Sequence, residues 1–354
     1  MPGNRLSADY SRRVTTPAAP LSRRLLLAGS LSAALLGALS GCSGDDEPAP
    51  EPEASAAPAF PTTIDHVYGA TTIEAEPRRI VVVGFTEQDT LLALGIAPVA
   101  TTTWVGDAPY NVFEWAADKL GDAQPTVLDS TEGLQLEEIE KLEPDLILGT
   151  NAGLTQEDYA ELSKIAPTVA NSGAYGSDYY EPWPTQTVVV GQAVGRSAQA
   201  KQLVTDLTQR FADAAAAHPQ FADVPAAFVQ APYTDGSVIA WPAGLNTDFL
   251  TDLGFTIPTS LNEFVGDELA QAEIPAEDAP VLDDAKVLVW GTDAPSDGAD
   301  IEADPVLGAL AAVKEGRSIY TGELLTSALY FNTILSMPYV LDTLVAELER
   351  ILPA

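Results

Sequence analysis

The sequence predicts an α/β protein made of two Rossmann-like lobes with mainly parallel sheets, joined by a single long spine helix. Short apolar runs typical of buried strands alternate with helical patterns between about residues 79 and 170. The same alternation restarts near residue 226 and continues to residue 320. Between these blocks, residues 197–217 form an unbroken amphipathic pattern. Because alternating strands and helices favour parallel sheets, each block is expected to form one lobe.

The first block defines an N-terminal lobe, which we assign to residues 62–184. Its apolar runs are short and bounded by turn-forming residues, as expected of strands buried on both faces. The expected strands are 79–84, 98–103, 144–149 and 167–170, and the expected helices are 87–94 and 137–142.

The second block defines a C-terminal lobe, residues 218–354, and the segment 185–217 is expected to connect the lobes. In this connector a helix over 185–194 is interrupted at Gly195, and the spine helix follows. A helix of this length spans about 30 Å and makes a rigid connector with a small hinge angle. In the C-terminal lobe the expected strands are 226–230, 238–241, 286–290 and 317–320, and the expected helices are 247–253, 305–313 and 335–351.

The first 41 residues have the pattern of a secretory signal peptide. Arg23 and Arg24 precede an uncharged run over residues 25–39, whose length of about 22 Å is short of a bilayer core of roughly 30 Å. The arginine pair resembles a twin-arginine export signal, with Sec export as the alternative. Residues 39–42, Leu-Ser-Gly-Cys, resemble a bacterial lipobox. This resemblance implies that Cys42 is lipidated and anchors the protein to the outer face of the cell membrane.

Residues 42–61 are acidic and rich in proline and alanine, so we expect a disordered tether after the anchor. Five of the 17 basic residues and one of the 51 acidic residues precede Cys42, which leaves 12 against 50 and a net charge of about −38. A field of this sign repels phosphate backbones, and nucleic-acid binding is therefore excluded.

Motifs for common enzyme classes are absent from the sequence, which has no Gly-x-Ser-x-Gly, His-Glu-x-x-His or phosphate-binding loop. The two histidines, His66 and His218, are expected to be solvated, and the sequence shows no His-carboxylate cluster for a metal ion. We therefore expect a binding protein without a cofactor and not an enzyme. An extracellular carboxylate-based hydrolase remains an alternative, because so many carboxylates produce chance pairs.

Several short segments, in this order and spacing, resemble the helical-backbone (class III) substrate-binding lipoproteins of ABC importers for iron siderophores and vitamin B12. The resemblance extends from Pro77 nearly to the C-terminus. The segments are Arg79-Ile80-Val81, Leu94-Gly95-Ile96-Ala97-Pro98-Val99, Leu136-Glu137-Glu138-Ile139, Leu142-Glu143-Pro144-Asp145-Leu146-Ile147, Ala166-Pro167-Thr168-Val169, Leu250 to Phe255 and Val313 to Tyr320. The resemblance implies a monomeric extracytoplasmic protein that captures a ferric siderophore and delivers it to an ABC permease, with haem or vitamin B12 as alternative ligands.

Aromatic residues gather where the predicted strands end. In open parallel sheets ligands bind beyond the carboxyl ends of the strands, so two facing lobes place these ends along a cleft. Exposed rings there are suited to an apolar ligand surface. The predicted ligand-binding residues are Phe85, Trp104, Tyr175, Tyr179, Trp241 and Tyr330.

The charge pattern limits the class of siderophore. Ferrichrome-type relatives carry a basic residue before the leucine-glutamate motif, where this chain has Asp129-Ser130-Thr131-Glu132. A triply anionic tris-catecholate complex would require several cations, and most basic residues lie on predicted helices or at strand starts. We therefore expect a neutral or cationic complex, of hydroxamate or mixed type, held by aromatic and cation–π contacts.

The resemblance also implies a permease-docking surface, because relatives carry one surface glutamate on each lobe for this purpose. Glu137 matches the position in the first lobe. Glu277 matches the position in the second lobe, with Glu273 or Asp278 as alternatives.

Overall fold

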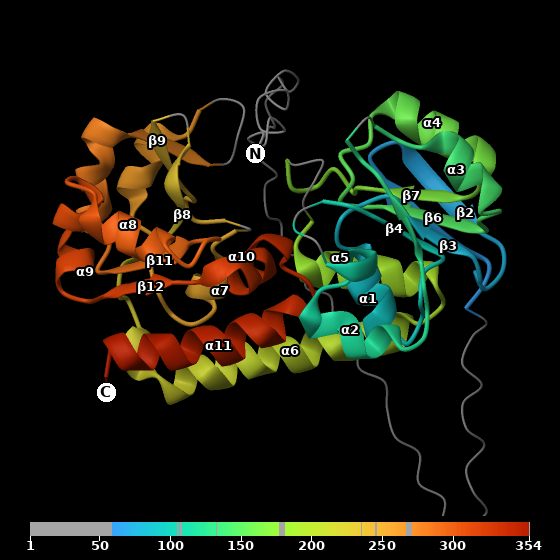
Figure 1. Ribbon diagram of the computed structural model, residues 1–354. Helices are drawn as coiled ribbons and strands as arrows, with labels where there is room; N and C mark the ends of the chain where they lie inside the picture. The colour runs from blue at the N-terminus through green and yellow to red at the C-terminus, as the bar shows by residue number, and fades with distance from the viewer. Residues whose placement is uncertain are drawn as a thin grey trace, which may run out of the picture. The chain divides into compact units, whose positions relative to one another are not determined.

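Two five-stranded sheets and a short hairpin organise the chain (Figure 1). The computed structural model describes residues 59–104, 106, 108–131, 133–176, 181–234, 236–244, 246–266 and 271–353. The signal peptide, Cys42 and the tether up to residue 58 therefore lie outside the described residues. Residues 59–354 form one compact unit, so the lobes named below belong to a single body.

The N-terminal sheet is entirely parallel, with strand order β5-β4-β3-β6-β7. Its strands are β3 Ile80–Val82, β4 Ala100–Thr102, β5 Thr126–Leu128, β6 Leu146–Gly149 and β7 Thr168–Ala170. The chain leaves β3 toward β4 and later returns to its other side as β6. The carboxyl ends of β3 and β6 therefore form the topological switch point, where ligands bind in folds of this type.

Helices cover both faces of this sheet (Figure 1). Alternate residues of β3 face opposite sides, since Ile80 and Val82 pack with α1 and α5 while Val81 packs with α3 and α4. The helices of the lobe are α1 Glu87–Ala93, η3 Pro109–Asn111, α2 Glu114–Leu120, α3 Leu136–Lys141 and α4 Gln156–Ile165. An antiparallel hairpin, β1 Thr62–His66 with β2 Gly69–Ile73, precedes the sheet and was not predicted. It buries His66, whose Nε2 lies 2.9 Å from Thr71 Oγ1, so the expectation of a solvated His66 is wrong.

The predicted spine helix is present as α6, Ser197–Ala217, which follows α5, Trp183–Ala193. Gly195 breaks the two helices with φ +69°, and a Cβ there would lie 2.6 Å from the Phe60 ring, so the turn requires glycine. Along α6, Ala200 packs in the N-terminal core, Leu207 in the C-terminal core, and Leu203 against both. One helix is therefore shared by the cores of both lobes, which confirms the predicted fold class.

The C-terminal sheet is mixed, with strand order β10-β9-β8-β11-β12. Strands β8 Ala226–Thr234, β11 Val287–Gly291 and β12 Ser318–Tyr320 are parallel, whereas β9 Ser237–Ala240 and β10 Ala272–Pro275 each run antiparallel to their neighbour. The helices are η4 Pro219–Phe221, α7 Asp248–Thr251, η5 Thr259–Phe264, η6 Ala276–Asp284, α8 Asp297–Ala303, η7 Leu307–Ala309, α9 Ala311–Lys314, α10 Gly322–Phe331 and α11 Ser336–Ile351.

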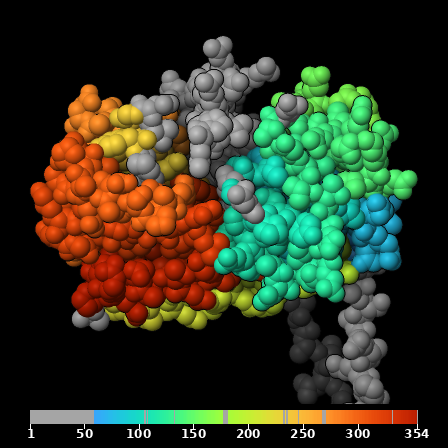
Figure 2. Space-filling model, in the orientation of Figure 1, coloured from blue at the N-terminus to red at the C-terminus, as the bar shows by residue number. Residues whose placement is uncertain are grey.

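Helix α11 packs beside the spine helix α6 (Figure 2). Arg210 Nη2 on α6 lies 2.8 Å from Asp342 Oδ1 on α11, and both side chains are largely exposed. The helix predicted over 305–313 is instead divided into η7 and α9, because Leu310 between them is extended (φ −57°, ψ 141°). Within the described part of the chain, no helix is long and apolar enough to span a membrane.

Candidate functional site

Two predicted rings meet at the carboxyl edge of the N-terminal sheet. Phe85 follows β3 and Trp104 follows β4. Their ring centroids are 5.1 Å apart with 22° between the planes, and both side chains are half-buried. Because β3 and β4 are parallel neighbours, their carboxyl ends bring these two rings to the same edge. The pair forms an aromatic surface beside the switch point, which we call the ring pair.

A buried carboxylate occupies the switch point itself. Glu87, at the start of α1, is fully buried, and its Oε1 accepts hydrogen bonds from Thr150 Oγ1 and the Asn151 amide, each at 2.9 Å. Its Oε2 accepts a hydrogen bond from the Thr86 amide at 3.1 Å. Burial raises the pKa of the Glu87 carboxyl, and these hydrogen bonds oppose the rise. The residues after β3 and β6 are therefore tied together at the switch point.

The same polar network reaches α5 and the loop after β7. Gln186 Nε2 and Asn151 Nδ2 donate to Thr86 Oγ1 at 2.7 and 2.8 Å. Asn151 Oδ1 accepts from the Glu181 amide at 3.0 Å, and Glu181 Oε1 accepts from the Ser172 amide at 2.6 Å. Buried hydrogen bonds of this kind hold the groups that they join in place, although Glu181 Oε2 is buried without a hydrogen-bond partner among the described residues. The sequence did not predict this network. Its only sequence signal is that polar residues follow the buried strands.

Tyr175, in the loop after β7, is the most exposed of the predicted rings that the structure describes, at 44%. Its hydroxyl lies 2.9 Å from Thr185 Oγ1 on α5. The predicted residue Tyr179 lies outside the described residues. Tyr175 is thus available for contact with a ligand, and its role stays a prediction.

The predicted rings of the C-terminal lobe, Trp241 and Tyr330, contact each other with centroids 5.6 Å apart. Trp241 also stacks on Phe228 at 4.7 Å and is only 6% exposed. Trp241 was expected at the ligand-binding edge of the sheet because β9 was expected to run parallel to its neighbours. Since β9 is antiparallel, its end lies level with Phe228 inside the lobe. The half-buried Tyr330 on α10 covers Trp241, and a ligand role for Trp241 stays a prediction.

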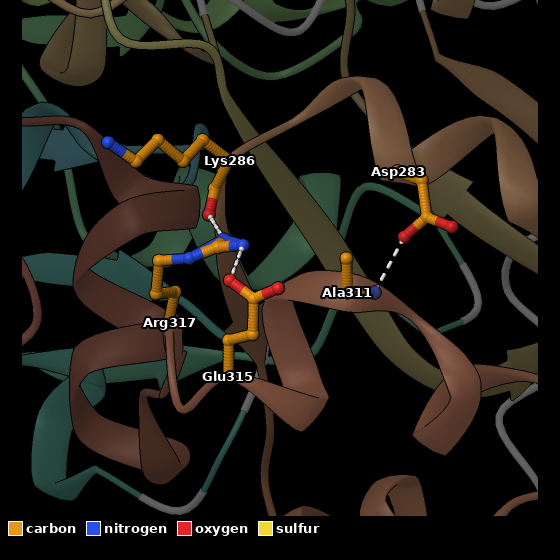
Figure 3. A network of polar contacts seen from close by, with 5 residues as sticks. All are labelled: Asp283, Lys286, Ala311, Glu315 and Arg317. Carbon is orange, nitrogen blue, oxygen red and sulfur yellow. Dashed lines mark hydrogen bonds and ion pairs between the residues drawn. The ribbon is translucent and has the colours of Figure 1, made fainter.

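Basic side chains are placed away from the carboxyl ends of the strands. All 12 lysines and arginines after Cys42 are described, and each is on a helix, in the turn before α6, or at the amino end of a strand. Figure 3 shows the arrangement in the C-terminal lobe, where Arg317 donates to the Lys286 carbonyl at 2.5 Å and to Glu315 at 2.6 Å. In the same view, Asp283 accepts a hydrogen bond from the Ala311 amide.

Acidic groups, in contrast, follow the parallel strands at their carboxyl ends. Asp293 follows β11, and burial, together with the charges of Asp297 and Glu323, raises the pKa of its carboxyl. In the N-terminal lobe, exposed Asp129 follows β5. These edges are therefore electrostatically unsuited to an anion. Among the described residues, no three His, Cys, Asp or Glu side chains gather as around a metal ion.

Two hollows on the surface of the C-terminal lobe are lined by none of the predicted rings. One, of about 300 Å³, lies near Tyr320 and Arg350, and the other lies between α6 and α11. The ring-bearing edges remain the candidate site, because they combine half-buried aromatic surface with the switch point.

Comparison with known proteins identifies the family. Residues 80–324, more than half of the chain, match the family model described as periplasmic binding protein. The chain belongs to this family. A periplasmic solute binding protein of Mycobacterium smegmatis strain MC2 155 is 43% identical, with a TM-score of 0.76, over 82% of this chain and 98% of that chain.

Two further relatives carry more specific names. PiaA of Streptococcus pneumoniae, an iron uptake ABC transporter substrate-binding protein solved in complex with ferrichrome, is 27% identical over 82% of this chain and 98% of that chain, with a TM-score of 0.69. The probable siderophore-binding lipoprotein YfiY of Bacillus subtilis is 32% identical over 153 residues, which are 43% of this chain and 44% of YfiY. The chain thus spans less than half the length of this curated relative.

In this periplasmic binding protein, the two predicted docking glutamates occupy equivalent local positions. Glu137 is exposed in the first turn of α3, and Glu277 is exposed in the first turn of η6. The neighbouring Glu138 is instead paired with Lys141 at 2.6 Å. Both predicted glutamates are therefore available at a surface.

Proposed function

We propose that this periplasmic binding protein captures an intact ferric siderophore outside the cytoplasm and delivers it to an ABC importer. The observation that carries the proposal is the ring pair of Phe85 and Trp104 beside the switch point of a sheet. Similarity to YfiY and to ferrichrome-bound PiaA supports an iron-siderophore ligand. The buried polar network at the switch point suits a preformed binding surface.

The ligand of this proposal is a neutral or cationic complex of the hydroxamate or mixed type. Aromatic rings and carboxylates at the strand ends favour such a complex through apolar and cation–π contacts. An anionic tris-catecholate would face Asp293 and Glu323 without a nearby cation from the described strand ends. Binding requires no cofactor and leaves the siderophore chemically unchanged.

The proposal further includes a lipid anchor at Cys42, a position on the outer face of the cell membrane and a monomeric state. The lipobox-like Leu-Ser-Gly-Cys sequence supports the anchor, and the name of YfiY as a lipoprotein agrees with it. Delivery to the permease is assigned to Glu137 and Glu277, which are exposed on different lobes.

A tryptophan fluorescence titration of the purified chain tests the proposal. The panel contains ferrichrome, a cationic ferric trihydroxamate, an anionic ferric tris-catecholate, haem and cobalamin. We expect saturable quenching by the two hydroxamates, reduced in a Trp104→Phe variant, and mass spectrometry should recover the ligand unchanged. Quenching by haem or cobalamin alone would overturn the ligand assignment. A chemically altered product would favour the hydrolase alternative.

A further inference from the structure

Asp89 is a buried carboxylate that joins the two lobes. It lies on α1 of the N-terminal lobe and is 1% exposed. Its Oδ2 accepts a hydrogen bond from Trp115 Nε1 on α2 at 2.8 Å. The same oxygen accepts a second hydrogen bond, at 2.5 Å, from Thr333 Oγ1, which belongs to the turn between α10 and α11 in the C-terminal lobe.

The Thr333 side chain also caps α11. Its Oγ1 accepts from the Ser336 amide at 2.8 Å, and Ser336 Oγ accepts from the Thr333 amide at 2.8 Å. A threonine hydroxyl has one proton, so this proton is directed to Asp89. The preceding residue, Asn332, is left-handed (φ 45°) and ends α10, the helix that carries Tyr330. The contact of Asp89 therefore fixes the position where the ring-bearing helix ends.

Apolar contacts surround this carboxylate at the lobe junction. Leu335, at the start of α11, packs on the cluster that contains Leu92 and Val112, and the Trp115 and Tyr339 rings lie 6.3 Å apart. Both described partners of Oδ2 are neutral groups. A buried carboxylate held by neutral donors in apolar surroundings is less favourable when ionised than the same group in water.

We propose that Asp89 is a charge-dependent contact between the lobes: its ionised form favours separation of the α10–α11 turn from α1 and α2, and its protonated form favours their contact. Separation would hydrate the carboxylate and remove the penalty for burying its charge. This inference concerns the ligand-free protein and does not depend on the proposed function. Where a ligand bridges Tyr330 and the N-terminal rings, ionisation of Asp89 would also speed ligand release.

The surroundings of Asp89 support this direction. Burial raises the pKa of its carboxyl to about 6, opposed by the hydrogen bonds from Thr333 and Trp115. Helix α5, which packs against α1, has no charged residue, and the Glu87 carboxylate of α1 is turned to Thr150 and Asn151. The other charged residues on the surrounding helices are Glu114, Asp118 and Lys119 on α2, Glu323 on α10, and Asp342, Glu347, Glu349 and Arg350 on α11, of which all but the half-buried Glu347 are exposed.

Hydrogen exchange of the ligand-free chain, measured by mass spectrometry on a peptide covering residues 332–340, tests the inference. After correction for intrinsic exchange, we expect opening of this segment in the wild type to be about ten-fold more frequent at pH 7.5 than at pH 5, given a pKa that falls from about 6 to its ordinary value on opening. In Asp89→Asn, opening of this segment should be as infrequent at pH 7.5 as at pH 5.

Two further variants complete the test. Asp248→Asn on α7 is the control, because the pKa of this carboxyl is also raised by partial burial while its side chain is more exposed than that of Asp89, and the variant should keep the wild-type response. Thr333→Val removes one donor from the ionised carboxylate and also the acceptor of the Ser336 amide, so opening should increase at both pH values and by a larger factor at pH 7.5 than at pH 5. The proposal is overturned if the wild type shows no difference between the two pH values. It is also overturned if Thr333→Val increases opening by no larger factor at pH 7.5 than at pH 5, or if Asp89→Asn retains the wild-type response.

Discussion

Phe85 and Trp104 stack with their ring centroids 5.1 Å apart, although 19 positions separate them in the sequence. The parallel pairing of β3 and β4 brings them together, since Phe85 lies three residues after the end of β3 and Trp104 two residues after the end of β4. The Glu87 network links the residues that follow β3 and β6. The ring pair thus lies at the edge of the sheet where two neighbouring parallel strands end.

Truncation of either ring should weaken siderophore binding. We expect Phe85→Ala and Trp104→Ala each to raise the Kd for a ferric trihydroxamate about 10- to 100-fold, because each removes a stacked ring and its contact area. Isothermal titration calorimetry measures the effect. Tyr159→Ala is the control, because this ring stacks on Tyr68 outside the site and its loss should leave the Kd unchanged. Wild-type affinity in both ring variants would exclude the ring pair from the site.

Gly84 is needed for the buried position of Glu87. A Cβ at Gly84 would lie 2.3 Å from both Glu87 carboxylate oxygens, so Gly84→Ala should displace this side chain from its three donors. We expect a loss of about 2–4 kcal/mol in the free energy of unfolding, because buried donors lose their acceptor. Urea unfolding measures this loss.

Two comparisons make the result for Gly84 specific. Gly266→Ala meets no atom within 4 Å and should change the unfolding free energy little. In the background of Glu87→Ala, the Gly84→Ala change should have a much smaller effect, because the clash is gone. Additive effects in this double-mutant cycle would show that Gly84 acts independently of Glu87.

Asp89 should make the stability of the fold depend on pH. Its pKa is raised by burial to about 6 from 3.8, so the folded carboxyl keeps its proton to a higher pH than the unfolded one. The stabilisation of the folded state by protonated Asp89 is complete below about pH 4. It is lost as the pH rises through 6, which lowers the free energy of unfolding by at most ~3 kcal/mol. Urea unfolding of the wild type and Asp89→Asn at pH 4.5 and 7 measures the difference. If the unfolding free energies of the wild type and Asp89→Asn differed by the same amount at both pH values, the raised pKa of Asp89 would be contradicted.

The sequence predicted those features that depend on local pattern. The buried strands of the N-terminal lobe and the helix over residues 197–217 were found close to their predicted positions, since apolar periodicity reports burial directly. Phe85 and Trp104 were each predicted at the end of a strand, but their stacking was not predicted and became visible only with the pairing of β3 and β4.

The remaining features depend on tertiary contacts that no local pattern encodes. The antiparallel direction of β9 placed Trp241 in the core, and a strand's own residues do not specify the direction in which it pairs. The polar network needs Thr86, Asn151 and Gln186 to meet from three elements. The contact of Asp89 with Thr333 joins positions 244 residues apart and is visible only once both lobes are folded.

Glu137 and Glu277 should act in docking to the permease. Each glutamate is exposed in the first turn of its helix, and surface charges of this kind set register and encounter rate across a large interface more than the stability of the fold. The double variant Glu137→Ala and Glu277→Ala should therefore bind the ferric siderophore with unchanged Kd while uptake of the labelled complex by cells is abolished. Glu157→Ala with Asp300→Ala is the matched control, because both are exposed acidic residues in the first turns of α4 and α8. Removing them causes the same loss of charge and of helix-terminus stabilisation, yet transport should continue. Normal uptake by the Glu137 and Glu277 double variant would place the docking surface elsewhere, with Glu273 and Asp278 as the next residues to replace.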